Sequence, residues 1–210
     1  MPRRGSIAGQ FGPVSGSARR LFNDATGGTI TTDTNYNGTG EIWRIHTFTS
    51  GGDFTTTKVP QTFSAAYGGG GGGSGENSQG NPGGRGGHGV SGTWTGLLEV
   101  GTYVITVGGG GAGAGQDPWG WGNGGSGGAS SAVKAPTTVF SGAGGGGGYG
   151  PGDQNHPVYP SIGSPDGPRN TYTVSGASVT YGGIGGNSPG STGGGNPGSA
   201  GSVVIAYRIG

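Results

Sequence analysis

The chain lacks cysteine, carries few charges and has no long hydrophobic run. Without cysteine, its 210 residues can form neither a disulfide framework nor a cysteine-based zinc site. No stretch approaches the roughly 18 apolar residues that a membrane-spanning helix requires, so we expect no membrane span. Lys+Arg number 10 and Asp+Glu 9, for a formal net charge of +1. Because nucleic-acid-binding modules usually carry a basic stripe, we expect no nucleic-acid partner.

Glycine is the residue that the chain has in excess, with 60 of 210 positions. This content disfavours a helical bundle, because an interior glycine costs about 1 kcal/mol relative to alanine. Collagen requires an unbroken glycine period and abundant proline, whereas this chain has 13 prolines and a broken period. Disordered chains usually combine low hydrophobicity with high net charge, which is absent here. Four tryptophans, eight tyrosines and six phenylalanines therefore predict a folded protein.

The first 24 residues differ from the rest and are predicted to form an N-terminal arm, with residues 25–210 as a glycine-rich β domain. Gly, Pro and Ser dominate the arm, and its two arginine pairs, Arg3-Arg4 and Arg19-Arg20, are candidates for anchoring the protein to a larger particle. A partly disordered terminus is the alternative. The opening residues lack the apolar core of a secretory signal. Together with the absence of cysteine, this fits assembly in a bacterial cytoplasm followed by later exposure.

Short β-type runs recur along the whole chain without a helical pattern between them. In residues 41–49, Ile42, Arg44, His46 and Phe48 alternate with Trp43, Ile45 and Thr47, which indicates a strand with two unlike faces. Ser50–Asp53 has the composition of a turn and predicts a hairpin with a return strand at 54–59. Such spacing indicates an all-β sandwich or a jelly-roll-like fold without significant helix. Further strands are expected at 29–32, 61–67, 94–100, 102–107, 132–140, 175–181 and 202–208, the last closing the fold.

Between the strands, glycine recurs at every third position. The clearest series are 80–92, 122–128, 142–148 and 195–201. A period of three is that of the polyproline-II helix, which has no internal hydrogen bonds. Glycine lets such helices pack backbone to backbone and bond to one another, which satisfies buried N–H and C=O groups. We therefore expect packed polyglycine-II tracts, with flexible linkers as the alternative.

Four segments together resemble the glycine-rich domain of bacteriophage minor tail proteins, with phages of mycobacteria and related actinobacteria the best fit. They are EIWRIHTFTSGGDFT, GLLEVGTYVITVGGGGAGAG, VFSGAGGGGGYG and GSAGSVVIAYRIG, and the resemblance covers residues 25–210. The architecture is also similar to the polyglycine sandwiches of phage tail-fibre adhesins and to the glycine-rich extracellular domain of anaplastic-lymphoma-kinase-type receptors. The resemblance implies a virion tail component that binds proteins or surfaces, and no catalysis.

No catalytic or metal-binding pattern stands out. Gly108, Gly110 and Gly113 match a dinucleotide-binding spacing, but the following GQDPWGWGNGG cannot form the helix that such a site needs. The three histidines are far apart in sequence, and His46 is expected to be a packing or hydrogen-bonding residue. We therefore expect no enzyme activity, no cofactor and no metal.

Aromatic residues in loops are the candidate contact surface. Trp119, Trp121, Tyr149, Tyr159 and Tyr172 lie in or beside segments rich in Gly, Pro, Asn and Asp. Such rings provide stacking faces for a saccharide or a protein partner, or they cap the glycine module and fill a subunit interface.

The sequence-based hypothesis is a structural virion protein at the tail tip or in a fibre. It is assembled in the host cytoplasm and contacts other tail proteins, and a homo-oligomer, guessed to be a trimer, is expected. The alternative is a host-cell adhesin that recognises cell-envelope glycan through its aromatic loops.

Overall fold

Eleven β-strands and no helix make up the secondary structure of the described part of the chain. The computed structural model describes residues 22–36, 38–75, 83–115, 122–149, 170–174, 177–181, 183–186 and 194–210. The strands are β1 Thr29–Tyr36, β2 Glu41–Phe48, β3 Gly52–Thr56, β4 Gln61–Gly68, β5 Ser91–Leu98, β6 Gly101–Thr106, β7 Ser130–Lys134, β8 Thr137–Gly142, β9 Asn170–Val174, β10 Ala177–Tyr181 and β11 Ser202–Arg208.

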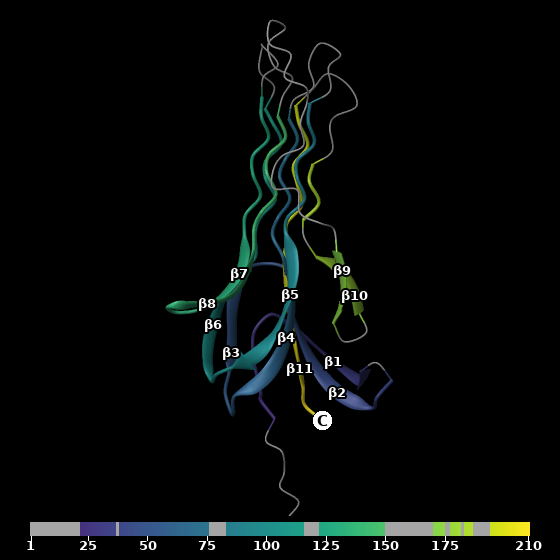
Figure 1. The fold of residues 1–210 in the computed structure, drawn as a ribbon, viewed down its shortest axis with the longest axis vertical. Coiled ribbons are helices and arrows are strands. Elements are labelled where there is room, and N and C mark those ends of the chain that lie inside the picture. The colour runs from purple at the N-terminus through teal and green to yellow at the C-terminus, as the bar shows by residue number, and fades with distance from the viewer. Residues whose placement is uncertain are drawn as a thin grey trace, which may run out of the picture.

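The strands form two larger antiparallel sheets and one separate hairpin (Figure 1). The first sheet has five strands in the order β1-β2-β11-β4-β5, and the second has four in the order β3-β6-β7-β8. β9 and β10 pair only with each other. The predicted all-β class is confirmed, and the two sheets are consistent with a β-sandwich.

Side chains from both sheets meet in one aromatic-rich core. Phe54 lies at its centre and is fully buried, with ring contacts to Phe48, Phe63 and Tyr103. The alternation predicted for residues 41–49 produces this arrangement, because His46 and Phe48 face the core. On the other face of β2, Trp43 and Ile45 pack against a smaller apolar cluster of Ala66, Val204 and Ala206.

The hairpin predicted between residues 41–49 and 54–59 is wrong. β2 pairs with β1 and β11, whereas β3 pairs with β6 in the opposite sheet. The turn after Phe48 therefore crosses from one sheet to the other. Phe48 and Phe54 then meet across the core through their side chains, with ring centroids 6.4 Å apart. Turn composition indicated a chain reversal but could not reveal which backbone each strand would bond to.

The single strand predicted over 132–140 is two strands, β7 and β8. They reverse at Ala135-Pro136, and Lys134 pairs with Thr137 across the turn. Proline lacks the N–H group that a continuous strand would need here. In the same way, the strand predicted over 175–181 is the second half of a hairpin in which Ala177 pairs with Val174.

The last strand has the predicted bounds but lies inside its sheet. β11 pairs with β2 on one side and β4 on the other, so Val203 opposes both Phe48 and Tyr67. A strand buried on both faces reads as a continuous apolar run, and five successive residues, 203–207, are indeed buried. The end of the chain thus completes the centre of the five-stranded sheet.

His46 is the one histidine among the residues described as fully buried. Its Nδ1 lies 2.7 Å from the carbonyl oxygen of Gly27, while its buried Nε2 has no hydrogen-bond partner. The rings of Phe54 and Tyr207 flank it at centroid distances of 5.0 and 5.8 Å. These contacts confirm the packing and hydrogen-bonding role expected from the sequence, with the neutral ring donating from Nδ1.

Acidification is expected to weaken the fold through His46. Burial holds its pKa below the ordinary value of 6.5, and nearby Arg44 lowers the pKa further, although the Gly27 carbonyl opposes the shift. Above about pH 6.5 both folded and unfolded states are neutral, so the full stability is present. Below that pH the unfolded chain binds a proton that the folded chain excludes. The free energy of unfolding then falls by up to about 1.4 kcal/mol per pH unit from this group.

Urea unfolding between pH 8 and 5 measures this effect when the protein is compared with His46→Gln, which cannot titrate. The stability advantage of the original chain over His46→Gln is expected to shrink as the pH falls below about 6.5. A constant difference across this range would contradict the prediction.

Candidate functional site

The glycine-rich segments leave the sandwich together and run side by side as a stalk (Figure 1). Among the described residues there are seven such tracts, and each follows or precedes a strand. Tract 69–75, which follows β4, is the central one, because its backbone bonds to all six others. The outer tracts are 84–90, 108–114, 124–128, 143–149, 183–186 and 195–201.

The N–H groups of the central tract bond to three outer tracts in rotation. Each successive residue points to a different neighbour, and the fourth returns to the first neighbour. The donor–acceptor pairs, at 2.8–3.0 Å, are Gly69–Val90, Gly72–Gly87, Gly75–Gly84, Gly70–Gly128, Gly73–Gly125, Gly71–Ser199 and Ser74–Asn196.

The C=O groups of the central tract accept bonds from the other three outer tracts with the same period. The donor–acceptor pairs, at 2.6–3.0 Å, are Gly183–Gly69, Gly186–Gly72, Gly145–Gly70, Gly148–Gly73, Gly111–Gly71 and Ala114–Ser74. The outer tracts also bond to one another around the stalk, as in Gly86 to Gly186 and Gly127 to Gly145. Every N–H of the central tract and every C=O from Gly69 to Ser74 is therefore bonded to another tract, without the pairing of a β-sheet or the internal bonds of an α-helix.

Glycine is required in the stalk because the backbones lie too close for side chains. A Cβ on Gly70, Gly72 or Gly73 would stand closer than 3.0 Å to backbone atoms of a neighbouring tract. Positive φ is not the reason, since the glycines of the described residues with positive φ lie outside the tracts. Gly109, on the outer side of its tract, has no atom within 4 Å of the corresponding Cβ position.

Larger side chains occur only where an outer tract faces solvent, and they are unevenly distributed. Arg85 and His88, three residues apart, lie on one tract, and the neighbouring tracts carry Tyr149 and Ile184, which are 50% and 44% exposed. In and directly beside the other three outer tracts, the exposed residues other than glycine are small or uncharged, namely Ala112, Asn123, Ser126, Ala129, Asn196, Pro197, Ser199 and Ala200. The stalk thus has one side with large side chains and one side without them.

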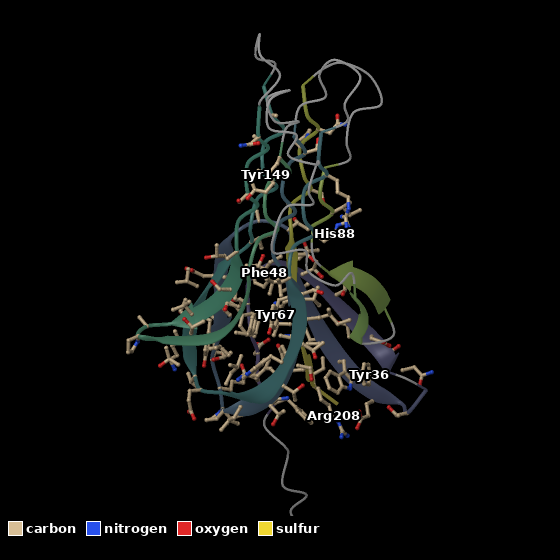
Figure 2. All side chains as sticks on the ribbon, turned by 45° about the horizontal axis from the view of Figure 1, so that its top comes forward. Tyr36, Phe48, Tyr67, His88, Tyr149 and Arg208 are labelled. Atoms are coloured by element: carbon tan, nitrogen blue, oxygen red, sulfur yellow. The ribbon has the colours of Figure 1, made fainter. Side chains whose placement is uncertain are left out.

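The stalk gives the molecule two unlike ends. Hydrogen bonds join Gly75 to Gly84 and Gly84 to Tyr149, so these residues lie together at the end away from the sheets. Figure 2 shows Tyr149 and His88 on the stalk, and Arg208 and Tyr36 at the opposite end. Tyr149 is therefore the candidate contact residue that the structure places at the far end of the described part of the stalk, which we call the tip.

The other sequence-predicted contact and anchoring residues are not placed. Tyr172 lies in β9, of which the structure describes the backbone. Trp119, Trp121 and Tyr159, and the four arginines Arg3, Arg4, Arg19 and Arg20, lie outside the described residues.

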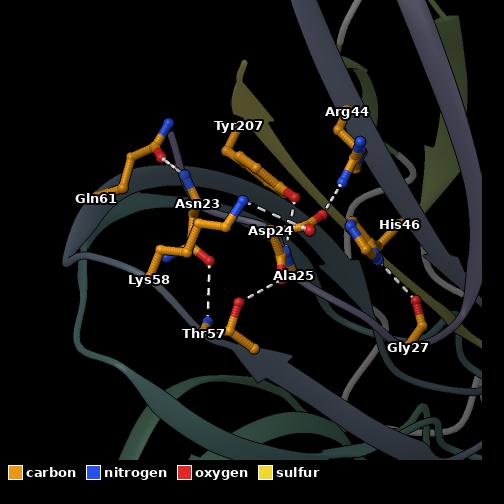
Figure 3. A network of polar contacts seen from close by, with 10 residues as sticks. All are labelled: Asn23, Asp24, Ala25, Gly27, Arg44, His46, Thr57, Lys58, Gln61 and Tyr207. Carbon is orange, nitrogen blue, oxygen red and sulfur yellow. Dashed lines mark hydrogen bonds and ion pairs between the residues drawn. The ribbon is translucent and has the colours of Figure 1, made fainter. Parts of the chain in front are cut away.

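The end opposite the tip, which we call the base, holds the last residues of the arm and the first residues after it. Asn23 is 3% exposed, and its side-chain oxygen accepts a hydrogen bond from the backbone N–H of Thr57 (Figure 3). Its side-chain amide donates to the carbonyl of Val59. The backbone N–H of Ala25 donates to the hydroxyl of Tyr207 at 2.9 Å. Thr26 and Thr55 exchange two backbone hydrogen bonds, which covers the edge of β3.

An ion network completes this attachment. Asp24 bonds to Arg44 of β2 and lies 3.7 Å from the ammonium of Lys58. The bond from Arg44, followed by the charge of Lys58, lowers the pKa of Asp24 below its ordinary value. Because Asp24 is half exposed, these pairs orient the segment more than they stabilise the fold. The arm is thereby joined at the base, with the stalk directed away from it.

Sequence patterns missed three of the seven tracts. The central tract reads as six successive glycines from Gly68 to Gly73, and a period of three cannot be seen in a run without other residues. The uninterrupted run of glycines was itself the signal of a central position, because a tract surrounded on all sides by other tracts has no room for a side chain. Tract 183–186 was missed because it is only four residues long, and tract 108–114 because it begins with four successive glycines that also hide the period.

Two absences apply to the residues that the structure describes. Within them there is no group of three or more metal-binding side chains and no helix long and apolar enough to cross a bilayer. No protein-family model matches the chain, and no curated protein matches its sequence.

Proposed function

We propose that this protein is a structural, non-catalytic component of a bacteriophage virion, a minor tail protein at the tail tip or in a fibre. The observation that carries this proposal is the stalk. A central tract bonded to six others makes a projecting rod that needs no hydrophobic core. Such a rod suits a tail component that extends outward from the particle. The resemblance of residues 25–210 to glycine-rich tail proteins supports the same function.

We further infer that the tracts are polyglycine-II helices. Hydrogen bonds that rotate through three neighbours with a period of three residues match the three-residue turn of that helix. Such a rod is held by backbone bonds alone, so its length can vary without a redesigned core.

The base is the proposed attachment end. The arm is joined there through Asn23 and Asp24, while Tyr149 marks the opposite end. In this arrangement the arm contacts other tail proteins and the tip is directed away from the particle. Homo-oligomerisation, with a trimer as the guess, would proceed through the sides of the molecule.

Incorporation into virions tests the proposal and the role of the arm separately. Mass spectrometry of purified particles is expected to find the full chain in the tail, and its absence from the particles would overturn the proposed function. Deletion of residues 1–21, which retains the Asn23 contacts, is expected to abolish incorporation. A second variant replaces Arg3, Arg4, Arg19 and Arg20 by glutamine and preserves the length of the arm. If these arginines anchor the arm, this variant is also expected to lose incorporation. Full incorporation of the deletion variant would refute anchoring by the arm.

The second candidate is a host-cell adhesin, which exposed Tyr149 at the tip favours. Replacing Trp119 and Trp121 by alanine separates the two functions. Normal assembly with lost adsorption supports the adhesin, whereas lost assembly supports a structural role for these rings.

A further inference from the structure

A cavity opens between β5 and the β7–β8 hairpin, where the two sheets are not joined. β5 is the last strand of the five-stranded sheet and β8 the last of the four-stranded sheet. The cavity has a volume of about 520 Å³, within the range of roughly 300–1,000 Å³ that small-molecule sites occupy. Its walls are Trp94, Leu97, Leu98, Glu99, Tyr103, Lys134, Ala135, Thr137, Thr138 and Val139.

Trp94 provides a flat aromatic wall that is held in position. Its six-membered ring lies over Gly96, where a Cβ would stand 2.5 Å from the ring. Phe140 supports the indole from the core at a centroid distance of 6.0 Å. The Trp94 side chain is half-buried, and its indole N–H has no hydrogen-bond partner among the described residues. The glycine at position 96 thus lets the indole lie flat on its own strand.

Polar groups of both signs surround this wall. The ammonium of Lys134 donates to the carbonyl of Val100 at 2.8 Å and lies 5.4 Å from the centre of the Tyr103 ring. These contacts fix its position and leave further N–H donors available. Glu99 contributes a carboxylate, and Thr137 and Thr138 contribute exposed hydroxyls. The Tyr103 hydroxyl is already engaged, because it donates to the Glu99 carbonyl at 2.9 Å.

We propose that this cavity binds a neutral saccharide, with the Trp94 indole as the stacking wall and Glu99, Lys134 and the two threonines as partners of the sugar hydroxyls. The negative charge of Glu99 and the positive charge of Lys134 balance, so the site favours neither anions nor cations. Sugar hydroxyls both donate and accept, which suits this mixed set. The C–H face of a sugar ring carries the weak positive charge that the face of an indole attracts.

This inference deepens the adhesin function and places a second, lateral glycan site on the sandwich itself. It does not depend on the tip aromatics or on the arm. Binding is measured with the purified full chain, so a failure here is distinguishable from a failure of virion incorporation.

The experiment follows the tryptophan indole N–H resonances by NMR while the full chain is titrated with cellobiose, maltose and chitobiose at millimolar concentrations. The Trp94 resonance is identified by its loss in Trp94→Phe. We expect at least one of these sugars to shift it saturably. Glu99→Gln is expected to weaken binding about tenfold, since it removes a charged acceptor. Asp53→Asn, the corresponding carboxylate-to-amide change at an exposed residue of β3 outside the cavity, is the control and leaves the affinity unchanged.

Three results would overturn the proposal. The first is the absence of a saturable Trp94 shift with all three sugars. The second is a shift that Glu99→Gln leaves unchanged, which would remove the carboxylate from the site. A Trp94 shift caused by a leucine-containing tetrapeptide, with none from the sugars, would likewise overturn it in favour of a protein ligand.

Discussion

Replacing Gly72 by alanine is expected to lower the free energy of unfolding by about 4 kcal/mol or more. Gly72 donates to Gly87 and accepts from Gly186, while its Cβ position is occupied by the backbone of Gly146. A methyl group there must push one tract outward, and the bonds of the adjoining residues would break with it. Buried backbone groups without partners cost about 1–3 kcal/mol each, so the losses add rapidly.

Differential scanning calorimetry measures this loss as a decrease of about 8–16 °C in the melting temperature, or as a separate early transition of the stalk. The matched control is Gly109→Ala, also in a tract but with open space at its Cβ position. Its stability is expected to stay within about 1 kcal/mol of the original, because a Gly→Ala change at an unstrained site also restricts the unfolded chain. Equal melting temperatures for the two variants would contradict the packed stalk.

The second large effect is expected at Phe54, where truncation to alanine should cost about 3–5 kcal/mol. Phe54 is fully buried and makes ring contacts with His46, Phe48, Phe63 and Tyr103, of which the first three belong to the opposite sheet. Removing the ring leaves a cavity where the two sheets meet. The aromatic edge contacts, each worth about 0.5–1.5 kcal/mol beyond burial, are lost as well.

Urea unfolding of Phe54→Ala and Phe54→Leu measures this contribution, with the smaller loss expected for leucine. Val104→Ala is the control. Val104 on β6 pairs with Asp53, the residue before Phe54 on β3, but its side chain is 54% exposed. The control is expected to change stability by about 0.5 kcal/mol or less. If Val104→Ala proved as costly as Phe54→Ala, the assignment of Phe54 to the central core would be wrong.

Together these two positions show that the protein is held by two different kinds of interaction. The sandwich depends on burial of aromatic and aliphatic side chains between its sheets. The stalk depends on backbone hydrogen bonds and on the absence of side chains. Ser130 connects the two parts, because its buried hydroxyl donates to the Gly68 carbonyl at 2.7 Å and accepts from the Gly108 N–H at 2.9 Å.

The local alternation of residues was sufficient to predict several features. His46 and Phe48 point into the core as their spacing from Trp43 and Ile45 indicates, because side chains on a strand alternate between its faces. The bounds of β11 were readable from a continuous apolar run. Glycine spacing also indicated bonding between tracts, since an outer tract tolerates a side chain at the one position in three that faces solvent.

The chain alone thus determined the all-β class, the approximate position of most strands, the apolar faces of β2 and four of the seven glycine tracts. These are local properties, set by side-chain period, β-branching and the space that glycine leaves. The tertiary structure decided which strands share a sheet, that β2 and β3 face each other across the core, and that tract 69–75 is the central one. It also brought Trp94, Glu99 and Lys134 to one cavity from three different segments. Pairing and convergence of this kind depend on contacts between residues distant in sequence, which no local pattern encodes.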